Sequence, residues 1–534
     1  MRFLILPLFF TILFSILSFN LYRLQIDEGF YYFGKIEARN GKPELRRGQI
    51  FFKDTRSGSD IRAALNSDYP IVYAVPKEIK DAKKTAGDIA GILKINEAKL
   101  AIMLDNPLSM FRLLIDRADK EMIDQVKKAK IQGIYTGFAQ DRSYPLESLA
   151  SQVLGFVGIN KDSSDPIGLY GTEKFFDYKL SLGDDVYLSI DRNLQIESER
   201  VLSGLVKKFN GTGGSIVIQE PKTGKILTIA GKPDFNPNSY SSSPIKNFLN
   251  PAVQYVYEPG SVFKPLTMAA GIDSGAFTPD TTFVDKGSVT LNGKTILNWD
   301  KKANGKITMT EVIEGSVNTG AVFAEQKIGH KTFTAYVKKF GLGENTGIDL
   351  PDEVSGSINN LGRKEARDID FATASFGQGV SVTPIQMISA FSALANGGVL
   401  MRPFVTEGTN PTIVRRVVSK ETATKVTGMM ESAVEKAKIA AIQHFRIAGK
   451  TGTAFIPKGG KYSEELIQTF VGFFPASDPK VTILIKLDKP NAPLAGITVV
   501  PAFHELAAFV INYYNVSPDM PFDSIHQSNP KTQP

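Results

Sequence analysis

With 534 residues, of which 42% are apolar and 22% charged, the chain is long enough for two or three well-packed domains of ordinary composition. Its net charge of +7 is modest and its basic residues form no dense block, so nucleic acid is not expected as a partner. The chain has no cysteine and only 4 scattered histidines, which argues against disulfides, a metal site and a serine–histidine triad, so we expect neither a metal nor a cofactor.

The first element along the chain is an apolar segment from Phe3 to Phe19, preceded by Arg2 and followed by Arg23. It approaches the ~20 apolar residues that a membrane-spanning helix needs. A cleaved signal peptide is the alternative, but no Ala-x-Ala-like site follows, and the segment is longer than the usual apolar core of ~7–15 residues. We therefore predict an uncleaved transmembrane anchor over residues 1–22.

Residues 23–185 form a predicted N-terminal module, elongated and mixed in secondary structure. Helical patterns run from Asp81 to Ile102 and from Leu108 to Ile131, among short strands. The turn Gly183-Asp-Asp185 then precedes a strand-like run from Val186 to Ile190. We place the domain boundary between these two segments.

Strands and helices alternate from residue 186 to 516, which predicts a second and larger domain. A helical run begins at Asp191, after the first strand. Val481 to Ile485 has the pattern of a buried strand, and Phe503 to Tyr514 that of an apolar helix that covers a sheet. Residues 517–534 are rich in Pro, Ser and Gln and are predicted to be a disordered tail.

A helix start is predicted within the second domain. Thr308 and Glu311 form a Thr-x-x-Glu capping box just before an apolar pair. Ser316 and Asn318 are expected to lie on the helix that begins there, or at its end.

Three short motifs of this domain together indicate one reaction: Ser261-Val-Phe-Lys264, Ser316-Val-Asn318 and Lys450-Thr-Gly452. A serine hydroxyl is a poor nucleophile near neutral pH and needs a base within hydrogen-bond reach. Residues i and i+3 share one face of a helix, so Lys264 is expected beside Ser261. A second Ser/Asn pair can relay protons, and a Lys-Thr-Gly strand can bind a carboxylate and leave bare backbone at its glycine. This combination predicts acyl transfer through a serine–lysine pair.

Each motif has a second copy in the chain, and the surroundings decide between the copies. The second copies are Ser243-Pro-Ile-Lys246, Ser357-Ile-Asn359 and Lys222-Thr-Gly224. Ser261 follows Glu258-Pro-Gly260 and precedes an apolar run, which predicts a helix that begins at the serine. The second copies lie in loop-like sequence or, for Lys222-Thr-Gly224, in the predicted turn of a β-hairpin.

Beyond these motifs, the sequence resembles class B penicillin-binding proteins over nearly the whole chain. In the N-terminal module the matching segments are Arg47-Gly48-x-Ile50, Arg142-Ser-Tyr-Pro145, Leu149-Ala150 with Val153-Leu-Gly-Phe-Val-Gly158, and Gly171-Thr-Glu173 with Asp177. In the second domain they are Ser189-Ile-Asp191 with Leu194-Gln195, Pro233-x-Phe235-Asn-Pro-Asn238, Tyr257-Glu-Pro-Gly-Ser261, Phe376-Gly-Gln-Gly379 with Thr383-Pro384-x-Gln386, and Gly472-Phe473 with Asp478-Pro479. The resemblance implies an α/β (α+β) multidomain protein: a transmembrane helix, a pedestal or dimerisation-like module over residues 23–185, and a penicillin-binding/transpeptidase domain over residues 186–516 with an antiparallel sheet flanked by helices.

The resemblance also implies which residues form the site. The catalytic residues would be the nucleophile Ser261, its general base Lys264, the proton relay Ser316, and Asn318, which would hold Lys264 and the donor peptide. The substrate-binding residues would be Lys450, Thr451, Gly452 and Thr453, and the backbone N–H groups of Ser261 and Thr453 would form the oxyanion hole. A neutral Lys264 needs a lowered pKa, which burial and the neighbouring Lys450 would supply.

The activity implied is that of a serine-type peptidoglycan D,D-transpeptidase, which cross-links stem peptides ending in D-Ala-D-Ala for septal cell-wall synthesis and is inhibited by β-lactams. The other expected partners are the membrane and a membrane glycosyltransferase of the division or elongation machinery. The catalytic domain is expected outside the inner (cytoplasmic) membrane on a single-pass anchor. An elongation-type transpeptidase, an enzyme that hydrolyses or senses β-lactams, and a non-enzymatic cell-wall scaffold stay open as alternatives. The long N-terminal module argues against the second, and the intact motifs argue against the third.

Overall fold

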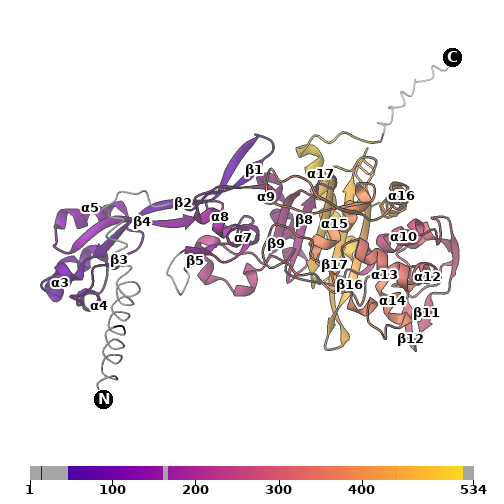
Figure 1. The fold of residues 1–534 in the computed structure, drawn as a ribbon, viewed down its shortest axis with the longest axis horizontal. Coiled ribbons are helices and arrows are strands. Elements are labelled where there is room, and N and C mark those ends of the chain that lie inside the picture. Colours follow the sequence, from indigo (N-terminus) through magenta and orange to yellow (C-terminus); the bar gives the residue numbers. More distant parts are fainter. Residues whose placement is uncertain (1–13, 15–45, 160–165, 439, 521–534) are drawn as a thin grey trace, which may run out of the picture.

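The computed structural model describes residues 46–159, 166–438 and 440–520, together with Phe14, and shows an elongated molecule of two lobes (Figure 1). A small lobe at one end is joined through a narrower middle part to a larger lobe that holds the main sheet. Within the described residues, no helix is both long and apolar enough to cross a membrane. The predicted anchor over residues 1–22, Phe14 apart, and most of the predicted tail lie outside them.

The small lobe and the middle part contain the elements that precede the second domain. They are β1 (Ile50–Asp54), β2 (Ser59–Ala74), η2 (Pro76–Glu78), α3 (Ala82–Leu93), α4 (Glu97–Leu104), β3 (Arg112–Ile115), α5 (Lys120–Ala129), β4 (Ile134–Ser143), α6 (Ser151–Leu154), β5 (Val157–Ile159), β6 (Pro166–Gly168), α7 (Gly171–Phe175) and α8 (Asp177–Ser181). Strand β2 pairs with β1, β3 and β4. Val72 and Ala74 of β2 and Ile134 of β4 are buried with the apolar side chains of α3, α4 and α5, so these helices cover one face of the sheet.

Two helices predicted for this lobe are each interrupted in the structure. Over Asp81 to Ile102 the chain forms α3 and α4, because Lys94 takes a left-handed conformation (φ 55°) that ends α3, and the Asn96 side chain caps α4. Over Leu108 to Ile131 it forms strand β3 and then α5, which the Asp119 side chain caps. Helical periodicity did not reveal β3, since this strand is held by pairing with β2, which is distant in sequence.

A buried ion network ties the middle part together. Glu173 on α7 is 0% exposed, and its carboxylate accepts hydrogen bonds from Arg47 Nε at 2.8 Å and Arg142 Nε at 2.6 Å. Arg47 also pairs with Asp177 of α8 at 2.8 Å. Because Arg47 precedes β1 and Arg142 lies near the end of β4, this network fixes two distant parts of the sheet against α7 and α8.

Strand β7 (Val186–Asp191) connects the two lobes. It pairs with β1 in parallel, while Ser189 bonds through its N–H and its hydroxyl to backbone carbonyls of the larger lobe. Asp191, at the end of β7, is buried and accepts hydrogen bonds from the Thr55 N–H of the β1–β2 turn at 2.9 Å and from the Tyr513 hydroxyl at 3.0 Å. The domain boundary predicted between residues 185 and 186 therefore precedes a strand that bonds to both lobes.

The larger lobe is built on a five-stranded sheet of order β16-β17-β18-β8-β9, in which every pairing is antiparallel. Its strands and the main covering helices are β8 (Gly213–Gln219), β9 (Ile226–Lys232), β16 (Ala448–Lys458), β17 (Lys461–Phe474), β18 (Val481–Asp488), α9 (Arg192–Lys208), α15 (Pro384–Ala395) and α17 (Val499–Tyr513). Ile216 and Ile218 of β8 pack in the same core as α9 and α17, whereas Val217 packs in the core of α15. The predicted strand at Val481 to Ile485 and the predicted helix at Phe503 to Tyr514 are confirmed as β18 and α17.

A helical region lies at the far end of the larger lobe, beyond the edge strand β16 (Figure 1). Its elements are η5 (Gly260–Phe263), α10 (Lys264–Asp273), β10 (Thr282–Asp285), β11 (Ser288–Leu291), β12 (Lys294–Leu297), β13 (Gly305–Thr308), α11 (Met309–Glu314), α12 (Asn318–Ile328), α13 (His330–Lys339), η6 (Asn359–Leu361), α14 (Asp368–Ala374) and α16 (Lys420–Ala437). The remaining short elements of the lobe are η3 (Pro237–Ser242), η4 (Ile245–Phe248), β14 (Val399–Met401), β15 (Ile413–Arg416) and η7 (Ala495–Ile497). The structure is thus a mixed α/β fold with helices on both faces of an antiparallel sheet, as predicted.

The ion network around Glu173 leads to a stability prediction. Glu173→Gln removes the charge that compensates two buried guanidinium groups, so we expect the free energy of unfolding to fall by about 3–5 kcal/mol. Urea denaturation of the full chain in detergent, followed by far-UV circular dichroism, measures this change. Lys174→Ala is the matched control, because Lys174 is 42% exposed in its pair with Asp352 and should contribute less than about 1 kcal/mol. Equal losses in the two variants would contradict a structural role for the network.

Candidate active site

The Ser261 turn is held by two glycines. Ser261 lies in the 3-10 helix η5, which runs directly into α10 at Lys264, so the helix predicted to begin at the serine starts as a 3-10 turn. Gly260 has a φ of 60° and donates its N–H to the Gly377 carbonyl at 3.0 Å. A Cβ on Gly377 would lie 2.3 Å from the Gly260 carbonyl oxygen, so only a glycine permits this contact. The contact with Gly377 therefore fixes the backbone that carries Ser261.

Lys264 is the centre of the site. Its side chain is 0% exposed, and Nζ donates hydrogen bonds to the Ser316 carbonyl, to Ser316 Oγ at 3.2 Å and to Asn318 Oδ1 at 2.8 Å. Within the described part of the chain these are its only hydrogen-bond acceptors, and the Ser261 hydroxyl is not among them. All of its acceptors are neutral, so no carboxylate in the cluster stabilises the charged form.

The environment lowers the pKa of Lys264 well below its ordinary value. Burial is the main cause, because it removes the water that solvates an ammonium group, and the nearby charge of Lys450 adds to it. The lowered pKa favours the free amine of Lys264, which is the form that can accept a proton.

Ser316 lies in a turn between two helices rather than on one helix. The predicted capping box forms between Thr308 and Glu311, but the helix it starts, α11, ends at Glu314. Ser316 then adopts a left-handed conformation with a φ of 54°, and Asn318 is the first residue of α12. With this reversal, both the Ser316 carbonyl and the Asn318 amide oxygen face Lys264.

A second buried lysine completes the cluster from the edge strand β16. Lys450 Nζ donates to Ser316 Oγ at 3.0 Å and to the carbonyl and hydroxyl oxygens of Thr451 at 3.2 and 3.3 Å. Ser316 Oγ therefore lies between two amines. Burial lowers the pKa of Lys450 to about 7, so a carboxylate that enters the site would raise this pKa and favour the charged form.

The rest of the Lys-Thr-Gly strand packs against the Ser261 turn. A Cβ on Gly452 would lie 2.8 Å from the Pro259 carbonyl oxygen and 3.0 Å from a methyl group of Val262, so the glycine is needed for this approach. Thr451 and Thr453 are half-buried, and Thr453 Oγ1 accepts a hydrogen bond from the Ala495 N–H at 3.4 Å. The structure thus brings all three motifs together, with five of their polar side chains in one hydrogen-bonded cluster and Ser261 on the turn beside it.

The second copies of the motifs lie elsewhere. Ser243 follows the short helix η3, and Lys246 is exposed. Lys222-Thr-Gly224 forms the predicted hairpin turn between β8 and β9, where Lys222 pairs with Asp478 at 2.5 Å. Ser357 bridges Ser381 in a loop. None of the three has a hydrogen bond to Lys264 or Lys450 among the described residues.

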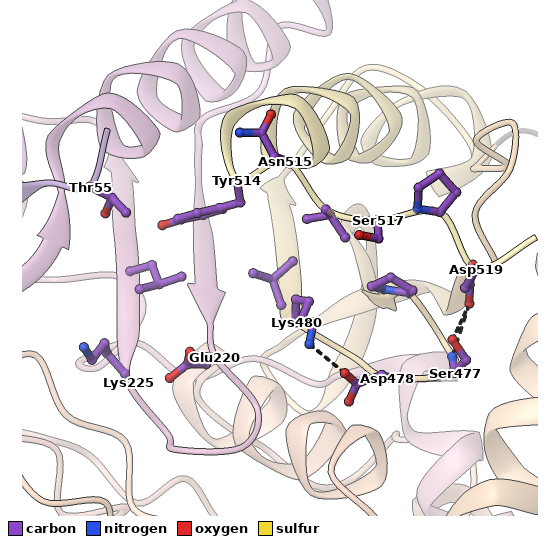
Figure 2. Close-up of a pocket in the computed structure, with 15 residues that line it drawn as sticks. Thr55, Glu220, Lys225, Ser477, Asp478, Lys480, Tyr514, Asn515, Ser517 and Asp519 are labelled. Carbon is purple, nitrogen blue, oxygen red and sulfur yellow. Dashed lines mark hydrogen bonds and ion pairs between the residues drawn. The ribbon is translucent and has the colours of Figure 1, made fainter. Parts of the chain in front are cut away.

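A separate cavity of about 630 Å³ lies between the starts of β9 and β18 and the segment that follows α17 (Figure 2). Side chains of both charges line it, and Lys480 pairs with Asp478 at its rim. It contains none of the motif residues, so it is not the site of their chemistry. In the described ranges no group of three or more His, Cys, Asp or Glu side chains is arranged to hold a metal ion.

One segment that contacts the site was not predicted from the sequence. At the end of β12, the Leu297 carbonyl accepts a hydrogen bond from Asn318 Nδ2 at 2.9 Å. Shortly after this strand, Trp299 Nε1 donates to the Gly315 carbonyl at 3.2 Å. Trp299 is the only tryptophan in the chain. The sequence contained one indication of this segment, an isolated Asn-Trp pair shortly before the Ser-x-Asn motif.

Comparison with known proteins agrees with this arrangement. The family described as "Penicillin binding protein transpeptidase domain" matches residues 214–507. Stage V sporulation protein D of Bacillus subtilis is 32% identical over 86% of this chain and 76% of its own length. Peptidoglycan D,D-transpeptidase FtsI of Escherichia coli K12 is 28% identical over 87% of this chain and 83% of its own length. The crystal structure of penicillin-binding protein 2X from Streptococcus thermophilus shares the fold, with a TM-score of 0.74 at 21% identity over 89% of this chain and 81% of that one.

Proposed function

Because the chain belongs to the penicillin-binding protein transpeptidase family, as a class B member, we propose that it is a peptidoglycan D,D-transpeptidase that works through an acyl-enzyme on Ser261. It cross-links stem peptides that end in D-Ala-D-Ala, and β-lactams inhibit it by acylating the same serine. The observation that carries the assignment of residues is the buried Lys264 amine, which shares one hydrogen-bonded cluster with the other two motifs.

In the acylation step, Ser261 Oγ attacks the carbonyl carbon between the two D-alanines, and its proton passes to the neutral Lys264 amine. The peptide C–N bond then breaks, and the leaving D-alanine amine takes a proton through Ser316, whose hydroxyl contacts both lysines. The acceptor peptide's amine attacks the resulting ester and restores the Ser261 hydroxyl as the proton returns. Proton transfer of this kind contributes ~10²–10⁴-fold to a rate.

The remaining residues bind and polarise the substrate. Lys450 and Thr451 hold the donor's terminal carboxylate, while Asn318 holds both Lys264 and the donor peptide. The backbone N–H groups of Ser261 and Thr453 form the oxyanion hole, which stabilises charge as it develops on the attacked carbonyl. The edge position of β16 supports these assignments, since an extended peptide can pair with a free strand edge.

We further propose that this reaction serves septal wall synthesis in division, together with a membrane glycosyltransferase. A second role, in sporulation, has support from one comparison, because a relative 32% identical to this chain is named Stage V sporulation protein D. Depletion in the source cell distinguishes the two. Filaments without septa support division, whereas normal division with failed sporulation supports the second role.

The attachment of this enzyme to the membrane is also a proposal. Residues 1–22 anchor the chain, and the catalytic lobe lies outside the cytoplasm, where the stem peptides are. We expect the purified membrane protein to keep its original N-terminus, because no small-residue cleavage site follows the apolar segment. N-terminal sequencing tests this, and a sequence that begins near residue 20 would contradict it.

The nucleophile can be tested by labelling. A fluorescent penicillin should form one covalent adduct, on Ser261, because this serine lies on the turn beside the buried lysine cluster, whereas Ser243 lies in a loop away from it. Peptide mapping by mass spectrometry locates the adduct, Ser261→Ala should abolish it, and Ser243→Ala should leave it unchanged. An adduct that lasts minutes to hours supports a transpeptidase, whereas turnover within seconds would indicate a β-lactamase. Labelling at Ser243 would overturn the proposal.

The two lysines should respond differently to arginine. Lys264→Arg keeps a charge but cannot act as a base, because arginine stays protonated, so acylation by penicillin should slow by at least ~100-fold. Lys450→Arg should slow it less, since a guanidinium still binds a carboxylate. The measurement is the second-order rate of labelling, with Lys246→Arg as an exposed control that leaves it unchanged. Equal rates for the Lys264 and Lys450 variants would show that their roles are assigned wrongly.

A further inference from the structure

We propose that residues 285–304, called here the clamp segment, position the catalytic cluster by fixing the orientation of the Asn318 amide and the Ser316 turn, with Asp285 as the positioning residue that holds the clamp in place. The segment runs from the end of β10 through the hairpin β11–β12 to the start of β13, at the far end of the larger lobe beside α12 (Figure 1). None of its side chains belongs to the three motifs.

The first contact of the clamp segment selects one of the two orientations of the Asn318 amide. Asn318 Nδ2 donates to the Leu297 carbonyl at 2.9 Å, and Oδ1 accepts from Lys264 Nζ at 2.8 Å. If the amide were reversed, its oxygen would face the Leu297 carbonyl oxygen, so the hydrogen bond to this carbonyl would be lost. The Leu297 carbonyl therefore determines which atom of Asn318 meets Lys264.

The second contact supports the turn that carries Ser316. A residue other than glycine in the left-handed region is unfavourable by roughly 1–2 kcal/mol, so the φ of 54° at Ser316 needs support from its surroundings. Trp299 Nε1 donates to the carbonyl of Gly315, the residue just before Ser316, at 3.2 Å. The two contacts hold the Ser-x-Asn motif on both sides.

Asp285 ties the clamp segment to α12. It is 2% exposed, and its carboxylate accepts hydrogen bonds from Asn298 Nδ2 at 2.8 Å and from Thr319 Oγ1 at 2.6 Å, as well as from the N–H groups of Gly287 and Asn304. Asn298 Oδ1 in turn accepts from the Thr319 N–H at 3.2 Å. Asn298 lies between Leu297 and Trp299, and Thr319 follows Asn318. One buried carboxylate thus fixes the register between the clamp segment and the start of α12.

A purely structural role for Asp285 would also reduce activity, so the test needs a readout that misfolding does not change. The pH dependence of acylation provides one, because the reaction requires neutral Lys264 and rises with pH through its pKa. Asn318 Oδ1 accepts a hydrogen bond from Lys264, and such an acceptor favours the protonated form. The charged group that perturbs Lys264 from a packed element is Lys450 on β16; Ser316 and Asn318 are neutral. If Asn318 turns away, the pKa of Lys264 falls further and the acid limb of the profile moves to lower pH.

The experiment measures acylation of the full-length protein by fluorescent penicillin between pH 4 and pH 9, resolving the acylation rate constant from the affinity of the preceding complex. Asp285→Asn replaces one acceptor oxygen by an NH2 group. In either orientation of the new amide, this NH2 group faces a hydrogen-bond donor and cannot accept its hydrogen bond. We expect the acylation rate constant to fall ~10–100-fold, as for a small misplacement of catalytic groups, with the affinity changed less than ~3-fold and the acid limb at lower pH. Thr319→Val should shift the limb in the same direction with a smaller loss, and Thr319→Ser, which keeps the hydroxyl, should restore wild-type behaviour.

Asp191→Asn is the matched control, because Asp191 is also a buried carboxylate with several donors but lies between the lobes, away from the cluster. This variant should lower the midpoint temperature of thermal unfolding without moving the acid limb of the pH profile of acylation. An unchanged limb in both Asp285→Asn and Thr319→Val would overturn the clamp. The inference rests on the proposed roles of Lys264 and Asn318, and the wild-type protein separates the two failures: a profile without an acid limb contradicts those roles, whereas a normal limb that the variants leave in place contradicts only the clamp.

Discussion

The chemistry of this chain depends on two buried amines that share one serine hydroxyl without a carboxylate between them. Lys264 and Lys450 both contact Ser316 Oγ, and neither forms an ion pair with Asp or Glu among the described residues. Two ammonium groups this close in a poorly solvated site repel each other strongly, so the cluster favours a neutral amine. An acidic neighbour would stabilise the charged lysine and so remove the base of the proposed mechanism. The neutral acceptors around Lys264 are therefore as necessary as its burial.

A site that keeps water and carboxylates away from a lysine is unfavourable for that lysine, so the rest of the fold has to stabilise it. The three motifs come from a 3-10 turn, an inter-helix turn and an edge strand, and close backbone contacts hold the turn and the strand in place. Gly260 against Gly377 and Gly452 against Pro259 leave no room for a side chain. Such contacts cannot relax by a rotamer change, so the positions of Ser261 and Lys450 are set by the packing of the whole lobe rather than by local flexibility.

A feature of the fold or of the site could be predicted from the sequence where its pattern lies within a few neighbouring residues. The motif residues, the capping box at Thr308, strand β18 and helix α17 were predicted, because each has its pattern within a few residues. The turn at Ser316 was not, since a left-handed serine has no mark in the sequence and is held by contacts from distant segments. The interruptions at Lys94 and strand β3 were missed for related reasons. The residues around Asp285 were missed entirely, because a buried aspartate resembles a surface one until its partners are known.

The second copies of the motifs show why sequence identity alone does not make a site. Ser243 has a lysine three residues later, as Ser261 does, but Lys246 is exposed and water solvates its ammonium group. The difference between the two pairs is their flanks: an apolar helix follows Ser261 and carries Lys264 into the core, whereas polar loop sequence surrounds Ser243. In the proposed mechanism, the reactivity of Ser261 thus originates in the apolar residues around the motif, which carry no reactive group themselves but remove water from the lysine that does.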